Sequence, residues 1–259
     1  MNRKIVSPLL CLALTVVLSG CFGAPRFSPD SEPLSVLDSR ARCEEVMQRR
    51  QPASSMRALV NAELTRGNES GQFRYAIVSR DSTSVRVDLL PPEGALTLAI
   101  LVIHDGVTTL VNAQERTFAA GNDESQLVER FFGIRGVTKE VVLGLLSGVV
   151  PELFCDEVTV YNRGDNSYIL VENAKHIAWN VNRTGIVRSV DILNSQNSSV
   201  QLRAKLAALS SDGLPTISLD LYEPYELTGS MVATTLTLNQ PVQERLFDVP
   251  VPADYQQVD

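Results

Sequence analysis

The sequence has few of the residues that most often carry out chemistry. It contains 2 histidines, 4 cysteines and 1 tryptophan in 259 residues. The motifs of serine hydrolases, zinc proteases, P-loop enzymes and dinucleotide-binding domains (GxSxG, HExxH, GxxxxGK, GxGxxG) do not occur. His104 precedes Asp105-Gly106, a pair that a tight turn explains, and we expect His176 on the surface of a strand. We therefore expect neither an enzyme nor a cofactor.

Basic residues are also few. The chain has 23 Lys and Arg against 30 Asp and Glu, a formal net charge of −7. The leader described below carries Arg3 and Lys4 and no acid, which leaves 21 bases against 30 acids, a net charge of −9. This excess of acid gives no general attraction for nucleic acid, which we exclude as a partner. The 44 % of hydrophobic residues excludes collagen, coiled coil and wholesale disorder, and indicates a globular domain.

Only one long apolar run is found, Ile5–Leu18, and it is short for a membrane span. A basic start precedes it, and Leu18-Ser19-Gly20-Cys21 closes it in a way that resembles a bacterial lipobox. We therefore predict that residues 1–20 are a lipoprotein signal peptide. The alternative is a plain signal peptide followed by a chance cysteine.

If the lipobox is used, Cys21 becomes the lipidated first residue of the mature chain. Its acyl chains, palmitate among them, would hold the protein on a membrane without a transmembrane helix. Phe22 stands where an aspartate would be expected for inner-membrane retention. By resemblance to enterobacterial lipoproteins this predicts the outer membrane, with the protein facing the periplasm. Residues 21–35 carry three prolines and little apolar periodicity, and we expect a flexible tether.

The remaining cysteines point to an oxidising compartment. Cys11 lies in the leader and Cys21 is used for lipid, which leaves Cys43 and Cys155. We predict a disulfide between these two, with two buried free thiols as the alternative. Neither has a CxxC partner, so redox catalysis and zinc binding are not expected.

Residues 36–259 are expected to form a single, mainly β domain. Apolar and polar residues alternate over many short segments that turn residues separate, as in antiparallel strands without crossover helices. The expected strands cover 56–66, a segment ending at 79, 83–90, 95–104, 107–112, 115–120, 157–161, 167–171, 175–181, 186–193, 200–209, 216–221, 229–238 and 245–249. That many strands in one sheet would curl, so the sequence predicts a curved antiparallel sheet.

Helical periodicity is found in three places: 36–51, 123–132 and 138–149. The stretch from Val141 to Pro151 is apolar nearly all round and contains Gly144 and Gly148. A core helix that fills a closed barrel is one interpretation. We favour a helical lid over a ligand-accepting cavity, because glycines four residues apart permit close packing without an over-stabilised helix. The residues expected to line the cavity are Leu96, Leu98, Ile100 and Val102 of the sheet with Leu127, Phe131, Val142, Leu145 and Leu146 of the lid.

Two stretches resemble a known family. They are Val85-Arg86-Val87-Asp88-Leu89-Leu90-Pro91-Pro92-Glu93-Gly94 running to His104-Asp105-Gly106, and Val142-Leu143-Gly144-Leu145-Leu146 before Pro151. With the lipobox and the order of elements, they resemble the LolA/LolB-like superfamily of periplasmic lipoprotein carriers, nearest to the LolB-type outer-membrane receptor. The resemblance implies an incomplete β-barrel that holds acyl chains beneath a helical lid, without a cofactor. Acylated lipoprotein or lipid would be the partner, together with a periplasmic carrier protein.

One feature departs from that family. LolB-type receptors present an exposed leucine in the loop after the third strand and use it to deliver cargo to the membrane. In this sequence Glu93 occupies that place, with Leu89 and Leu90 a few residues earlier. A carboxylate does not readily enter acyl chains. Two hypotheses follow: a lipid-anchored carrier of acylated cargo, or a structural or regulatory envelope lipoprotein that uses the same scaffold to bind a protein.

Overall fold

The computed structural model describes residues 24–81, 83–93, 96–164, 166–207, 213–222 and 224–258. These residues form a single sheet of 14 strands in the order β14-β6-β5-β4-β3-β2-β1-β13-β12-β11-β10-β9-β8-β7. The strands are β1 Ser55–Arg66, β2 Glu69–Arg80, β3 Ser84–Leu90, β4 Ala99–His104, β5 Val107–Asn112, β6 Thr117–Gly121, β7 Val158–Asn162, β8 Ser167–Glu172, β9 Ile177–Asn182, β10 Val187–Leu193, β11 Val200–Leu206, β12 Thr216–Leu221, β13 Leu227–Leu238 and β14 Gln256–Gln257.

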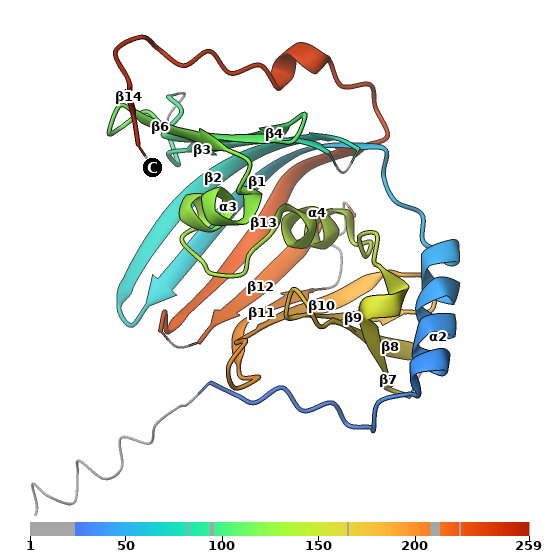
Figure 1. Cartoon of the computed structure of the whole chain (residues 1–259). Coiled ribbons are helices and arrows are strands. Elements are labelled where there is room, and N and C mark those ends of the chain that lie inside the picture. Colours follow the sequence, from blue (N-terminus) through green and yellow to red (C-terminus); the bar gives the residue numbers. More distant parts are fainter. Residues whose placement is uncertain are drawn as a thin grey trace, which may run out of the picture.

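The sheet consists of two meanders joined along one seam. Strands β1 to β6 follow one another in order, as do β7 to β13, and β1 pairs antiparallel with β13. The sheet is not closed, since β14 and β7 lie at its two edges. It curves around two helices that cover its concave, inner face (Figure 1). The mainly β architecture with an incomplete barrel and a helical lid is therefore confirmed.

The described part of the chain contains three α-helices, and each begins at a residue that can cap it. They are α2 Val36–Arg49, α3 Glu124–Phe132 and α4 Lys139–Ser147. The side chains of Asp123 and Thr138 accept hydrogen bonds from backbone N–H groups in the first turns of α3 and α4. Helix α4 ends earlier than its apolar pattern predicted, because Gly148 has φ +70° and caps it in the left-handed region.

A disulfide ties α2 to the second meander. Cys43 and Cys155 are bonded, with their Cα atoms 5.5 Å apart, as the sequence predicted. Cys155 begins a short 3₁₀ helix, η1 Cys155–Glu157, that leads into β7. The buried residues of α2 are Ser39, Cys43 and Val46. The Ser39 hydroxyl accepts a hydrogen bond from the backbone N–H of Val160, so α2 is joined to the edge strand β7 both covalently and by hydrogen bonding.

Residues 24–35, the N-terminal segment, make regular contacts where the sequence had suggested a flexible tether. The backbone N–H of Phe27 donates to Ser198 at 3.0 Å, and the N–H of Val200 donates to Pro25 at 2.8 Å. The Phe27 ring packs edge-on against Tyr161, with 6.2 Å between centroids. This ring helps cover a second apolar cluster, on the outer face of β7–β11. Local polarity and prolines could not show this, because the partners are distant in sequence.

The C-terminal segment, residues 239–258, crosses the outer face of the first meander (Figure 1). The prediction of a strand over 245–249 is wrong: Glu244–Leu246 is a 3₁₀ helix, η2, and the buried Phe247 follows it. The guanidinium of Arg86 donates to the carbonyl of Leu246 at 2.9 Å. At its end the segment adds β14 parallel to β6. The strands that residues 245–249 cross are already hydrogen-bonded to their neighbours on both sides, so these residues have no free strand edge with which to pair.

Candidate functional site

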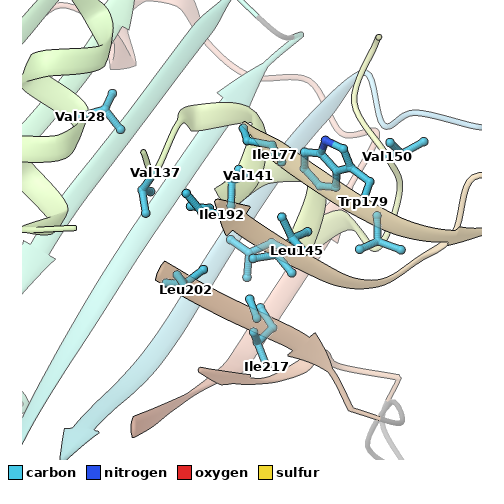
Figure 2. Close-up of a cluster of buried hydrophobic side chains, with 14 of the residues drawn as sticks. Val128, Val137, Val141, Leu145, Val150, Ile177, Trp179, Ile192, Leu202 and Ile217 are labelled. Carbon is cyan, nitrogen blue, oxygen red and sulfur yellow. The ribbon is translucent and has the colours of Figure 1, made fainter. Parts of the chain in front are cut away.

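The inner face of the sheet and the two helices over it form the main core of the protein. We call α3 and α4, with the turn between them, the lid. Helix α3 contributes the buried Leu127 and Val128, and α4 contributes Val141, Gly144, Leu145 and Leu146. These side chains belong to one core cluster with residues of both meanders. Figure 2 shows those of the second meander, among them Ile177, Ile192 and Leu202. The lid therefore holds the two meanders together through apolar contacts across their concave side.

Helix α4 packs closely against β9 at Gly144. A Cβ atom built there would lie 3.0 Å from two ring atoms of Trp179 on β9, so the glycine allows the backbone to approach the indole. Trp179 is fully buried, and its Nε1–H donates to the carboxylate of Glu172 at 2.9 Å. Figure 2 shows this indole among the apolar side chains that surround α4. The only tryptophan of the chain thus lies at the contact between lid and sheet.

The space between the first meander and the lid is filled in this closed arrangement. The cavity bounded by β3, β4, α3 and α4 measures about 10 Å³. It is lined by Val85, Val87, Leu101, Ile103, Val128, Phe132, Lys139, Val142 and Leu143. That volume is too small for a ligand, so an acyl chain can enter this interior only if the lid moves.

Two larger pockets flank the lid at opposite ends of the strands. One, about 350 Å³, lies where β1 begins and β2 ends, with Met56, Leu143 and Val150 among its apolar lining. The other, about 340 Å³, lies where β4 and β6 begin, with Leu89, Leu110 and Phe131 in its wall. The lid lies between these pockets: Leu143 of α4 lines the first and Phe131 of α3 lines the second.

The five lid residues named from sequence all lie in or beside this core. Leu127, Leu145 and Leu146 are buried, and Phe131 and Val142 are partly buried against the same cluster. The sequence did not identify the residues of the sheet that oppose them. On β4 those are Leu101 and Ile103, and on β9 the indole of Trp179. A lone tryptophan in a strand of alternating pattern was the available signal for the latter.

The sheet residues named from sequence do not all face the lid. Ile100 and Val102 lie on the outer face of β4, opposite Leu101 and Ile103, so they do not face the lid. Val102 is nevertheless 4 % exposed; it pairs with Arg86, the residue that bonds the C-terminal segment. Leu98 lines the pocket beside α3. The prediction that Ile100 and Val102 line the cavity is therefore off by one position along β4, since Leu101 and Ile103 face the lid instead.

Leu96 is 81 % exposed and precedes β4, so it does not line the interior either. It belongs to the loop between β3 and β4, the one through which LolB-type receptors deliver cargo to the membrane. Of the residues named there, Leu89 lines the pocket beside α3, Leu90 ends β3, and Glu93 is exposed. The exposed leucine of this loop is therefore Leu96, three residues after the carboxylate. Cys21 lies outside the described residues.

His104 and Asp105, the neighbouring polar residues considered for chemistry, lie away from the lid. His104 lies on the outer face, where its ring stacks on Phe247 with 5.5 Å between centroids. Its Nδ1 is 3.1 Å from the Ser84 hydroxyl, and its Nε2 is 3.4 Å from Asp105. Asp105 has φ +51° and belongs to the turn between β4 and β5, as the sequence predicted. Among the described residues, no group of three or more His, Cys, Asp or Glu side chains could hold a metal.

Tyr75 of β2 connects the sheet to the lid through aromatic contacts. Its ring lies 6.3 Å from Phe131 and 5.8 Å from Phe132 of α3, centroid to centroid. Burial raises the pKa of Tyr75 to about 12. The phenolate is therefore disfavoured in the folded protein relative to the unfolded chain, whose tyrosines have a pKa of about 10.

This difference in pKa predicts that the folded protein loses stability at alkaline pH. The contribution of Tyr75 to stability is complete below pH 10 and is lost as the pH rises from about 10 to 12, by about 2–3 kcal/mol in all. Tyr75→Phe should lose less stability over that interval than the wild type. Urea denaturation at pH 9 and at pH 11.5 measures both proteins. Equal losses would show that the phenol is not shielded by the lid.

Comparisons with known proteins identify the fold. No family model matches the sequence, and no curated protein matches it. Solved structures do match: a LolA superfamily protein of Nitrosomonas europaea has TM-score 0.53 at 11 % identity, with 82 % of this chain and 97 % of that one covered. The chain has a LolA-like fold. A putative outer membrane lipoprotein-sorting protein domain of Vibrio parahaemolyticus agrees, with TM-score 0.57, 9 % identity, and 83 % and 97 % of the two chains covered.

A DUF1329 family protein of Desulfovibrio piger is similar to the same extent, with TM-score 0.58, 10 % identity, and 82 % and 97 % coverage. At such identities the similarity establishes the LolA-like architecture but not the function. It confirms that the loose motifs in 85–106 and 142–151 indicated the right fold. In the described part of the chain, no helix is both long and apolar enough to span a membrane.

Proposed function

We propose that the protein is a lipid-anchored carrier or receptor that binds acyl chains of lipoproteins or lipids between its half-barrel and its lid. In this proposal Cys21 carries the anchor, and the protein faces the periplasm from the outer membrane. A periplasmic carrier would hand acylated cargo to it. The names of two structural neighbours, a LolA superfamily protein and a lipoprotein-sorting domain, support this class of function.

The observation that carries the proposal is an apolar inner face covered by a lid that packs on it through apolar side chains. Hydrogen bonds also join the lid to the rest of the protein, at its turn, from the Arg135 N–H to the Tyr225 hydroxyl, and at the end of α4, from the Val187 N–H to the carbonyl of Gly148. Displacing α4 would expose Val141, Leu145 and Leu146 together with the sheet residues below. Each methylene of an entering acyl chain gains about 0.8 kcal/mol on burial. A long chain can therefore replace the contacts that the lid gives up. The pockets at both ends of the lid offer places where entry can begin.

Binding is tested with a matched pair of peptides. The purified full chain should bind a peptide whose N-terminal cysteine carries acyl chains, and the peptide without them should not bind. Lipid extracted from the protein and analysed by mass spectrometry should contain acyl lipid, which the acylated peptide displaces. Equal affinity for the two peptides would overturn the proposal.

Delivery to the membrane is assigned to Leu96. Because this side chain is 81 % exposed at the loop between β3 and β4, it is placed to enter a bilayer where Glu93 is not. We expect Leu96→Glu to bind acylated peptide normally and to transfer it to vesicles at least tenfold more slowly, because a carboxylate is excluded from hydrocarbon. Leu37→Glu is the matched control, since Leu37 is 80 % exposed on α2. Equal transfer by both variants would contradict the assignment.

The filled interior also fits a second candidate function, that of a structural or regulatory envelope lipoprotein that binds a protein partner. The cavity of about 10 Å³ beneath the lid is what this alternative expects. It predicts a protein that never takes up acyl lipid and whose partners are retained irrespective of acylation. Partners recovered in proportion to their acyl chains would exclude it.

A further inference from the structure

The C-terminal segment, residues 239–258, reaches both faces of the sheet. It crosses the outer face of the first meander (Figure 1), yet its residue Val258 packs against the main core on the inner face. Between these points it turns around the edge of the sheet at β6, where β14 pairs in parallel with Thr117 and Phe118. A single segment thus connects the outer face with the interior that we propose as the acyl-binding site.

Val258 forms part of the wall of the pocket beside α3. This pocket, of about 340 Å³, is lined by Val258 together with Phe131 of the lid and Leu110 of β5. A ligand that enters it therefore meets both the lid and the sheet. Among the described residues, none of the C-terminal segment lines the pocket of about 350 Å³ at the other end of the lid. The segment is placed to control access at one end of the lid.

The first part of the segment is held firmly on the outer face. Phe247 is 3 % exposed, and its ring stacks on that of His104 with 5.5 Å between centroids. The guanidinium of Arg86 donates to the carbonyl of Leu246 at 2.9 Å. Burial of an aromatic ring and a hydrogen bond from a charged donor both stabilise this attachment. The segment is therefore well anchored as far as Phe247.

Residues 249–258, which we call the strap, are held by a shorter interface. The strand β14 has two residues, and both are exposed. The backbone N–H groups of Gln256 and Val258 donate to the carbonyls of Arg116 and Phe118 at 3.0 and 2.8 Å. Parallel pairing is slightly less stable per residue than antiparallel pairing. These contacts at the edge can open locally while the rest of the sheet stays paired.

The chain between the two attachments contributes little to holding the strap. Pro250 and Pro252 have no backbone N–H to donate to a strand. Asp254 lies 3.7 Å from Arg116, but both side chains are more than half exposed, and such a surface pair stabilises weakly. We therefore expect β14 and Val258 to detach while Phe247 stays in place.

The pocket beside α3 also adjoins the loop to which membrane delivery is assigned. Leu89 and Leu98, on either side of that loop, line the pocket, and the N–H of Leu98 donates to the carbonyl of Leu89 at 2.8 Å. Leu96, which is 81 % exposed, lies two residues before Leu98. An acyl chain in this pocket thus lies close to the residue that would enter the bilayer. This favours the α3 end of the lid for entry and exit.

We propose that residues 249–258 are a strap that closes the pocket beside α3, and that acyl chains enter and leave there when β14 detaches from β6. Detachment removes Val258 from the wall of the pocket and uncovers the edge of β6. The chain then fills the pocket before the lid moves. The inference rests on the proposed acyl-binding function, whereas detachment of the strap itself is measurable without ligand.

Hydrogen exchange in the full chain tests detachment in the absence of ligand. The amides of Gln256 and Val258 should be protected at least about tenfold less than those of Val128 and Phe131 inside α3, because the strap opens before the lid. Equal protection of the two groups would show that strap and lid open as one unit, which would overturn the proposal.

The rate of acyl binding tests the role of the strap in entry. Val258→Gly removes the apolar contact that holds the strap to the core, so stopped-flow binding of acylated peptide should become about fivefold faster. Val242→Gly is the matched control, since Val242 is partly buried in the same segment but precedes Phe247. Its rate should stay within about twofold of the wild type, because the strap is unchanged. Equal rates for the two variants would overturn the proposal.

A locked strap gives the opposite result. Thr117 and Gln256 are partners in the pairing of β6 with β14, so Thr117→Cys with Gln256→Cys can join the two strands by a disulfide. The oxidised double variant should bind acylated peptide at least about tenfold more slowly than Thr117→Cys alone, because the open form is lost. Unchanged entry in the locked protein would overturn the strap but leave the proposed function intact. A wild type that binds no acylated peptide would instead overturn the proposed function, and acyl entry at the strap with it.

Discussion

Replacing both Cys43 and Cys155 by serine is expected to lower the free energy of unfolding by about 4–5 kcal/mol. The disulfide spans 112 residues of sequence, and the entropy that a cross-link removes from the unfolded chain grows with the loop it closes. It also holds α2 against η1 and β7, at an edge of the sheet where no further strand pairs. The other contacts at that edge are non-covalent, among them the hydrogen bond from Val160 to Ser39 and the ion pair between Arg40 and Asp156.

Chemical denaturation of the double variant and the wild type, both fully oxidised, measures this difference. The wild type under reducing conditions is the control and should approach the stability of the variant. The cooperativity of unfolding should be retained, because the main core lies on the inner face. A loss below about 1 kcal/mol would contradict the expected role of the bond.

Gly144→Leu is expected to destabilise the closed lid by about 2 kcal/mol and at the same time to strengthen acyl binding. The higher helix propensity of leucine stabilises α4 equally in the closed and the displaced position, so it does not change the equilibrium between them. Overpacking a filled core costs about 1–3 kcal/mol and affects the closed position alone, because even a Cβ atom at residue 144 lies 3.0 Å from the rigid ring of Trp179. The strain is relieved when α4 moves away from β9.

If opening of the lid limits binding, weakening the closed state raises the apparent affinity. A change of about 2 kcal/mol in that equilibrium corresponds to roughly 30-fold, as long as the open form remains the minor one. Peptide titration of the variant, with Gly144→Ala as the smaller step, measures the effect. A variant with lower stability and unchanged or weaker affinity would show that the lid does not control entry.

Much of the fold could be predicted because its signals are local. Asp105-Gly106 forms the two-residue turn between β4 and β5, with positive φ at both positions, as the pair predicts. Asp123 and Thr138 start the lid helices at the expected residues. In each case neighbouring residues determine the backbone conformation, so no distant partner has to be known.

The errors arise where both sides of an element are covered. Strand β4 reads Ala99-Ile100-Leu101-Val102-Ile103, apolar in both phases, so alternation cannot say which face meets the lid. The C-terminal segment buries the outer face, and its contact with Arg86 joins residues 160 apart in sequence. The N-terminal segment likewise packs on strands far along the chain. Only the three-dimensional structure brings such partners together.

The most direct test of the central claim, that acyl chains enter beneath the lid, uses the tryptophan at the lid contact. Trp179 is the only tryptophan, is fully buried, and touches α4 at Gly144. We would titrate the full chain with a peptide whose acyl chain carries bromine atoms, which quench indole fluorescence on contact. The account predicts strong quenching at saturation, reversed by an unbrominated acyl peptide. Saturation of binding with no loss of Trp179 emission would place the acyl chain elsewhere and contradict the account.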